Sequence, residues 1–151
     1  EWRNSNASLS CPGTEGDSNG FVVKKDNAKW ETGQVEDESG LLTYPQNIEN
    51  GIITGKYPGI DIKTGDHFRT VIGCLDGYSN CNVMFSLNYQ VDGGAIQNLG
   101  TWTQTYDKSL QSLDVDLSSL NGKKVVFILK VEANGSPSDD GAFWLAPRVT
   151  R

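Results

Sequence analysis

Catalytic groups are scarce in this chain. Histidine occurs once in 151 residues, as His67, and no serine stands in the Gly-x-Ser-x-Gly turn that exposes a nucleophile. No cysteine–histidine arrangement suggests an activated thiol. Neighbouring acids such as Glu36 and Asp37 could serve as glycosidase carboxylates, although surface acids are the commoner explanation. We therefore predict that the chain is not an enzyme.

Long apolar runs and clusters of positive charge are also absent. No stretch approaches the roughly 18 apolar residues of a membrane-spanning helix. The net charge is −6 and the basic residues are dispersed, whereas proteins that bind nucleic acid gather lysine and arginine into patches. The composition therefore disfavours membrane insertion and a nucleic-acid partner.

A signal peptide is not visible at the start of the chain, which opens in polar sequence with Glu1-Trp2-Arg3-Asn4. Glycine is abundant, with 17 residues, and lysine-rich helical surface is sparse. These features predict an extracellular protein, secreted or at the cell surface. We expect this chain to be a monomeric module linked to a larger multidomain protein.

Cysteine is limited to three residues, so one thiol has no partner within the chain. Cys74 and Cys81 enclose the turn-forming pairs Asp76-Gly77 and Ser79-Asn80. This spacing predicts a hairpin closed by its own disulfide, which stabilises a fold by about 2–3 kcal/mol. The alternative, a metal site, needs Cys-x-x-Cys spacing and more soft ligands. Cys11 is then free or paired outside the chain.

Alternation of apolar and polar residues with a period of two dominates the sequence. It is clearest over Cys81–Val91 and recurs over 112–117, as expected for half-buried strands. The run Val125–Leu129 is apolar on both faces, which predicts a central strand covered on both sides. Weaker strands are expected at 20–24, 51–56, 60–63, 67–74, 101–106 and 142–149, separated by turn signals. Residues 116–121 could form one helical turn.

Eight to ten short strands without a long helical period predict an all-β fold. We expect a β-sandwich of jelly-roll type, with two antiparallel sheets, formed by residues 1–151 as one domain. The first forty residues are more irregular, and we expect them to lie as a loop layer over one sheet. In the last strand, alternation places Phe143, Leu145 and Val149 on one face and Trp144 and Arg148 on the other.

The last strand also carries a family resemblance. Asp140, Ala142, Trp144 and Arg148 stand in register with an Asp-x-Ala-x-Trp-x-x-x-Arg pattern, which follows an Asp-Leu-Ser turn and the strand over 125–131. This order resembles the end of extracellular carbohydrate-binding β-sandwiches, in particular the NPCBM-like modules attached to glycoside hydrolases. The resemblance covers roughly the last forty residues. It implies an accessory glycan-binding module and makes the matching residues features of the fold rather than of sugar specificity.

Sugar binding needs aromatic rings for the C–H face of a pyranose and planar polar groups for its hydroxyls. Trp30 lies in a polar stretch, Tyr78 at the hairpin tip, and Trp102 on one strand face with Gln104 and Tyr106. The alternative for the aromatics is packing beneath a long loop, and for His67 and Arg69 a solvated strand face. The residues that we predict to contact a glycan are Trp30, His67, Arg69, Asp76, Tyr78, Trp102, Gln104 and Tyr106.

Asp139 and Asp140 are adjacent acids that precede the last strand. Jelly-roll binding modules often carry a structural calcium near this strand, and calcium takes six to eight oxygen ligands. We expect these acids, with backbone carbonyls from the 26–38 region, to be able to hold one structural Ca²⁺. The alternative is a turn in which the acids cap backbone N–H groups.

The sequence thus predicts a non-catalytic carbohydrate-binding module that holds a polysaccharide by aromatic stacking and hydrogen bonds. An alternative of a different class is an extracellular structural or adhesion module that contacts protein. A small jelly-roll lyase or hydrolase is a third interpretation, which the shortage of catalytic groups disfavours.

Overall fold

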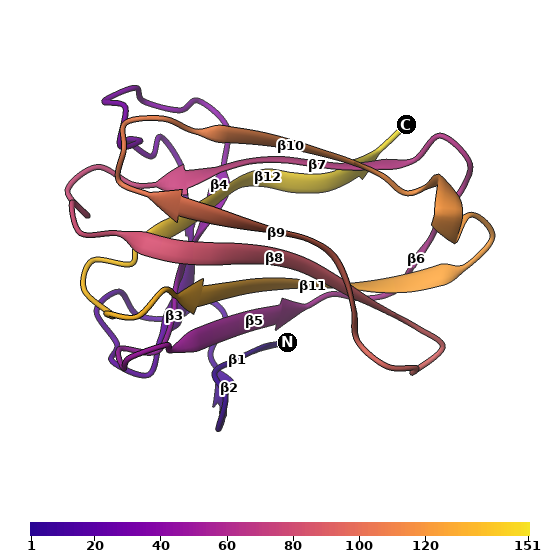
Figure 1. The fold of residues 1–151 in the computed structure, drawn as a ribbon, viewed down its shortest axis with the longest axis horizontal. Helices are drawn as coiled ribbons and strands as arrows, with labels where there is room; N and C mark the ends of the chain where they lie inside the picture. The colour runs from indigo at the N-terminus through magenta and orange to yellow at the C-terminus, as the bar shows by residue number, and fades with distance from the viewer.

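Two antiparallel β-sheets pack face to face in the computed structural model, which describes residues 1–151 (Figure 1). The seven-stranded sheet has the order β2-β1-β5-β11-β8-β9, with β6 paired to β11. The five-stranded sheet has the order β10-β7-β12-β4-β3. The predicted antiparallel sandwich is confirmed.

The strands are short, and most begin within two residues of the predicted bounds. In the seven-stranded sheet they are β1 (Trp2–Arg3), β2 (Ser8–Leu9), β5 (Ile52–Lys56), β6 (Ile60–Asp61), β8 (Asn82–Val91), β9 (Gln97–Thr105) and β11 (Lys124–Ala133). In the five-stranded sheet they are β3 (Phe21–Lys25), β4 (Gly40–Tyr44), β7 (His67–Cys74), β10 (Gln111–Asp116) and β12 (Ala142–Thr150). The single helical element is the 3-10 turn η1 (Ser118–Leu120), so no helix is long enough to cross a membrane.

The main core lies between the two sheets. Val83, Phe85 and Leu87 of β8 face it, as their alternation predicts, and meet Trp144 of β12. The rings of Phe85 and Trp144 pack edge to face with centroids 4.9 Å apart. Trp144 is fully buried, so the role of this residue in the fold, rather than in a site, is confirmed.

A second cluster lies on the outer face of the five-stranded sheet. Residues 26–39, between β3 and β4, cover this face, and Trp30 packs edge to face on Phe143 of β12 with centroids 5.1 Å apart. A Cβ at Gly73 would lie 3.0 Å from the Trp30 ring, so glycine lets the indole lie directly on β7. The expected loop layer exists, although it spans 26–39 rather than the whole first forty residues, which also contain β1, β2 and β3.

One strand expectation is wrong in part. The register of β12 shifts between Leu145 and Arg148, where Ala146 has a φ of 40°. This bulge reverses the alternation, so Val149 packs on the core between the sheets and Phe143 packs on the outer cluster. The strand β11 is central, between β5 and β8, as expected, and Ile128 on its outer face is buried although it belongs to neither hydrophobic cluster.

Candidate functional site

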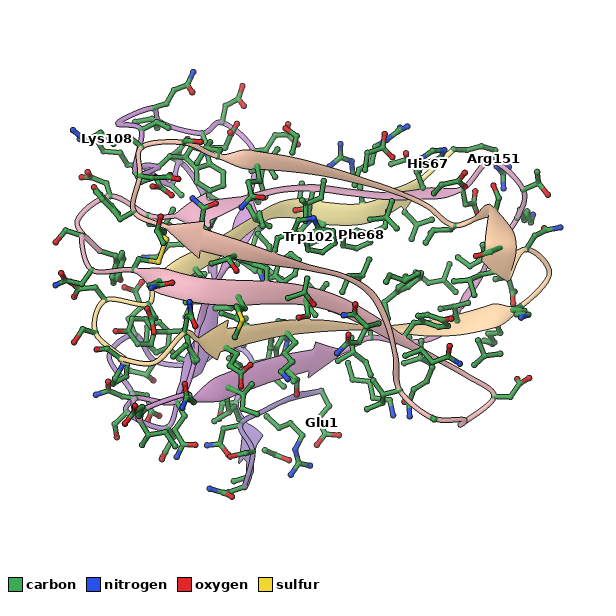
Figure 2. The ribbon with its side chains drawn as sticks, in the orientation of Figure 1. Glu1, His67, Phe68, Trp102, Lys108 and Arg151 are labelled. Atoms are coloured by element: carbon green, nitrogen blue, oxygen red, sulfur yellow. A yellow bond between two sulfur atoms is a disulfide. The ribbon has the colours of Figure 1, made fainter.

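The predicted glycan contacts separate into groups that lie far apart along the sandwich. The loops β7–β8, β9–β10 and β11–β12 gather at one end, on the left in Figure 1, and β6 and η1 lie at the other end. Figure 2 places Lys108 at the loop end, His67 and Arg151 at the opposite end, and Trp102 between them. A single site that contains all the predicted residues is therefore excluded.

The loop end is held by the predicted disulfide between Cys74 and Cys81, while Cys11 is a free, exposed thiol. The disulfide links the end of β7 to the residue before β8 and so closes the loop 75–80, which carries Tyr78. The predicted hairpin is wrong, because β7 and β8 lie in different sheets and do not pair. We call the segment 74–81 the disulfide loop. Beneath it, the hydroxyl of Tyr106 accepts a hydrogen bond from the Gly77 N–H at 3.3 Å and donates one to Asp76 Oδ1 at 3.2 Å. Tyr106 thus supports the disulfide loop, and its hydroxyl is engaged within the protein.

Tyr78 is partly exposed and borders two pockets of about 250 and 330 Å³. Its ring lies over Gly141, where an added Cβ would come within 2.5 Å of it. Small-molecule sites usually measure about 300–1,000 Å³, so each pocket is close to the lower end of that range. An ion pair between Lys25 and Glu15 links the rims of the two pockets.

The first pocket combines aromatic rings with exposed polar groups. Tyr44 lies between Phe21, on which it stacks at 5.2 Å, and Tyr78, whose centroid is 6.1 Å away. Opposite these rings the pocket is lined by Glu15, Asp17, Ser18 and Asn47, all exposed. Burial raises the pKa of both the Tyr44 and Tyr78 hydroxyls, so both remain neutral hydrogen-bonding groups. An aromatic wall facing carboxylate, hydroxyl and amide groups suits a polyhydroxylated ring.

The second pocket has an apolar floor and a charged rim. Ala28, Leu42 and Leu75 form the floor and are buried. On the rim, Lys29 Nζ lies 3.6 Å from Asp76 Oδ2. Of the predicted contact residues, Tyr78 and Asp76 therefore line this site. Sequence analysis missed Tyr44, Asp17 and the other residues that line the first pocket with Tyr78, because they lie far from the disulfide loop in sequence.

Two predicted contacts, Trp30 and Gln104, are wrong as ligand-facing groups because they are buried, and the predicted contact at Trp102 stays a prediction. Trp30 is 1% exposed, and its Nε1–H donates to Glu36 Oε2 at 3.2 Å, so its ring offers no face to a sugar. Gln104 is 2% exposed and its amide donates to Glu31 Oε1 at 2.7 Å. Trp102 is half-buried, packs against the core and lies over Gly100 on its own strand.

His67 and Arg69 lie side by side on the outer face of the five-stranded sheet, as alternation predicts. Both contact one acid of β10: His67 Nδ1 lies 2.6 Å from Asp114 Oδ1, and Arg69 Nε lies 3.4 Å from Asp114 Oδ2. Arg69 also donates to the Thr150 hydroxyl at 2.9 Å. The hydrogen bond from His67 and the nearby Arg69 lower the pKa of Asp114. This arrangement is an exposed cross-strand charge network, remote from the Tyr78 pockets.

Asp139 and Asp140 differ in their surroundings. Asp139 Oδ2 accepts hydrogen bonds from the Asn80 backbone and side-chain amides at 3.3 and 2.9 Å. Asp140 is fully buried; its Oδ1 accepts from the Asn82 N–H at 3.1 Å, and its Oδ2 has no partner. Burial raises the pKa of Asp140 to about 6. An unpartnered buried carboxylate oxygen fits the oxygen chemistry that calcium requires.

Comparison with known proteins gives matches among solved structures alone. No protein-family model matches the chain, and no curated protein does. TmCBM61 in complex with beta-1,4-galactotriose matches with a TM-score of 0.56 and 10% identity, over 99% of this chain and 88% of that chain. CBM51 from Clostridium perfringens GH95, in complex with methyl-galactose, matches with a TM-score of 0.57 and 16% identity, over 99% and 94%.

A third match belongs to a larger protein. The glycoside hydrolase domain of Endo-D from Streptococcus pneumoniae R6 has a TM-score of 0.52 and 15% identity, over 87% of this chain and 21% of that chain. At identities of 10–16%, the similarity of this chain to the three solved structures is a similarity of backbone fold. The chain therefore has the β-sandwich fold of carbohydrate-binding modules.

Proposed function

We propose that this chain is a carbohydrate-binding module that holds a neutral glycan at the two pockets beside Tyr78. The observation that carries the proposal is the partly exposed Tyr78 ring, bordered on both sides by pockets with polar rims. One sugar ring in each pocket would let consecutive units of a chain share the tyrosine. The fold supports the proposal, because two solved modules of this fold were determined with galactose-containing ligands.

The charges around Tyr78 favour an uncharged ligand. Glu15 and Asp17 line the first pocket, and Asp26 and Asp76 the second, against Lys25 and Lys29. Carboxylates accept pairs of hydroxyl hydrogen bonds well, but they repel an anionic sugar. The disulfide supports an extracellular setting, since such bonds persist in oxidising compartments. In this proposal the chain binds and does not turn over its ligand, as an accessory module of a secreted or surface protein.

An NMR titration tests the proposed site. Neutral polysaccharides, beginning with β-1,4-galactan, are screened by affinity gel electrophoresis, and a short oligosaccharide of the retained polymer is titrated into the labelled protein. We expect the amide signals of residues 15–18, 44, 47 and 76–78 to move, because these residues line the pockets or belong to the disulfide loop.

Three results would contradict the proposal. Blank screens across neutral glycans would favour the adhesion interpretation, in which the module contacts protein. Signal changes confined to the opposite end, around His67, would place the site elsewhere. Hydrolysis or elimination of any oligosaccharide during the titration would show that the chain is an enzyme.

We also propose that Asp140, with Asp139, holds a calcium ion. We expect calcium to raise the melting temperature of chelator-treated wild-type protein and to leave the melting temperature of the Asp140→Asn variant unchanged.

Without calcium, the buried Asp140 carboxyl also makes stability depend on pH. Its folded-state pKa of about 6 lies above the unfolded value of about 3.9. The stability that this group contributes is therefore present below about pH 4 and is lost as the pH rises through 6.

Melting scans in chelator check the sign of this pH dependence. From pH 7 to pH 4, wild type should gain stability relative to Asp140→Asn, on the order of 2 kcal/mol. An unchanged wild-type melting temperature on adding calcium would count against the ion. If the difference in stability between wild type and Asp140→Asn stayed constant from pH 7 to pH 4, this result would count against a raised pKa at Asp140.

A further inference from the structure

A groove crosses the outer face of the seven-stranded sheet, away from the Tyr78 pockets. It has a volume of about 460 Å³ and is lined by residues of β1, β5, β11 and β8, together with Ile96 of the turn that follows β8. Its floor includes Ile128 of β11, which is 5% exposed. The polar and charged side chains that line the groove therefore stand over an apolar base.

Three cations meet in this groove because of the strand register. Arg3 of β1 and Lys130 of β11 both pair with Thr54, from opposite sides of β5, and Lys56 pairs with Ile128. Neighbouring strands lie about 4.8 Å apart, so the backbones of Arg3 and Lys130 are separated by about 10 Å. Lys56 lies two residues along β5 from Thr54, on the same face. The three side chains therefore form a triangle over a small area.

These cations have no carboxylate partner. None of the ion pairs of the protein includes Arg3, Lys56 or Lys130, whereas Lys25 and Lys29 at the Tyr78 pockets pair with acids. The single acid that lines the groove is Glu1, whose carboxylate accepts the Ser8 hydroxyl at 2.9 Å. The groove is thus positively charged on a protein with a net charge of −6, which favours an anionic ligand.

The neutral part of the lining indicates what kind of anion fits. Thr54, Asn88 and Gln90 present hydroxyl and amide groups, and Ile52 and Ile96 present apolar surface. Hydroxyls, C–H surface and spaced negative charges occur together in an acidic polysaccharide. The lining has no aromatic residue, which disfavours single-stranded nucleic acid because its bases stack on aromatic rings.

We propose that this groove binds a polyuronate, a polysaccharide with one carboxylate on each sugar unit, running across β1, β5, β11 and β8. Arg3, Lys56 and Lys130 bind carboxylates, and Thr54, Asn88 and Gln90 bind hydroxyls. The three cations are separated from one another, which suits a polymer with one negative charge on each sugar. A sulfated glycan carries more negative charge per sugar than these three cations can neutralise. This second surface is independent of the neutral-glycan site at Tyr78 and opposite to it in charge.

Affinity electrophoresis with polygalacturonate, heparin and β-1,4-galactan tests the inference. We expect wild type to be retarded most by polygalacturonate, with retardation that weakens as salt is added. The Lys56→Gln/Lys130→Gln double variant should bind polygalacturonate at least tenfold more weakly. The matched control, Lys123→Gln/Lys124→Gln, removes the same charge from exposed positions outside the groove and should keep wild-type affinity within about twofold. Melting curves establish that both variants fold.

The outcomes separate the inference from the function proposed for Tyr78. Tyr78→Ala should bind polygalacturonate as wild type does, even if it loses every neutral glycan. Absence of retardation by polygalacturonate would overturn the inference. An equal loss of polygalacturonate affinity in the groove double variant and in the Lys123→Gln/Lys124→Gln control would also overturn the inference, because it would show that net charge alone determines binding. Stronger retardation by heparin than by polygalacturonate would overturn the assignment to uronates.

Discussion

Replacing Glu31 by alanine is expected to lower the free energy of unfolding by about 3–5 kcal/mol, among the largest effects of any single substitution in this chain. Glu31 is 2% exposed. Its Oε1 accepts from the Cys74 N–H at 2.9 Å and the Gln104 amide at 2.7 Å. Its Oε2 accepts from the Asp107 and Lys108 N–H groups at 2.7 and 2.9 Å. Alanine would leave all four donors without this acceptor.

The size of the effect follows from what Glu31 joins. The covering loop 26–39, the end of β7 at the disulfide, and the β9–β10 loop meet at this one carboxylate. A buried donor that loses its partner costs about 1–3 kcal/mol, and the hydrogen bonds to an ionised acceptor are the stronger kind. The free energy of unfolding of Glu31→Gln should lie between those of Glu31→Ala and wild type. The glutamine oxygen can still accept hydrogen bonds, but its amide nitrogen would face N–H donors.

Chemical denaturation checks this prediction, with Glu38→Ala as the matched control. Glu38 lies in the same loop and is exposed, so its removal should change the free energy of unfolding by less than about 0.5 kcal/mol. For a chain of this size the loss at Glu31 corresponds to a fall in melting temperature of about 10 °C or more. Equal stabilities of the two alanine variants would contradict the role of Glu31.

Sequence analysis succeeded where local periodicity determines burial. The strand β8 alternates over its whole length, and its apolar face enters the core as predicted. It did not predict the strand β4. Leu41 of β4 packs on the core between the sheets, and Leu42 packs on the cluster beneath the covering loop, so both faces of this strand are apolar. A short strand that is apolar on both faces has no alternation to detect.

The candidate site was less predictable, because distant contacts decide which side chains remain exposed. Trp30 and Glu31 lie in a polar stretch, which suggested exposure. The covering loop instead folds back onto β7 and β12, where Gly73 and Phe143 receive the indole. The donors to Glu31 come from residues 74–108, so no local pattern signals them. The partial exposure of Tyr78 was predictable, because the disulfide and the turn residues place it at the tip of a short loop. That this loop connects the two sheets, and is not a hairpin within one sheet, was not predictable from the spacing of the cysteines.

Tyr78 gives the second prediction of large effect. Tyr78→Ala should weaken binding of the glycan selected by the neutral screen at least tenfold, or about 1.4 kcal/mol, because both pockets lose their shared wall. Tyr78→Phe keeps the ring and should retain affinity within about threefold. Calorimetry below the melting temperature of each variant separates lost affinity from lost stability.

Gly141 allows the same test without changing the tyrosine. A Cβ at residue 141 would lie 2.5 Å from the Tyr78 ring, so Gly141→Ala should displace the ring and weaken binding nearly as much as Tyr78→Ala.

Trp102→Ala is the matched control for both variants, because this half-buried aromatic packs on the core and lines neither pocket. It should lower stability and leave affinity within about twofold of wild type. If Trp102→Ala abolished binding while Tyr78→Ala preserved it, the glycan would lie at the β9 edge of the sandwich and the Tyr78 site would be wrong.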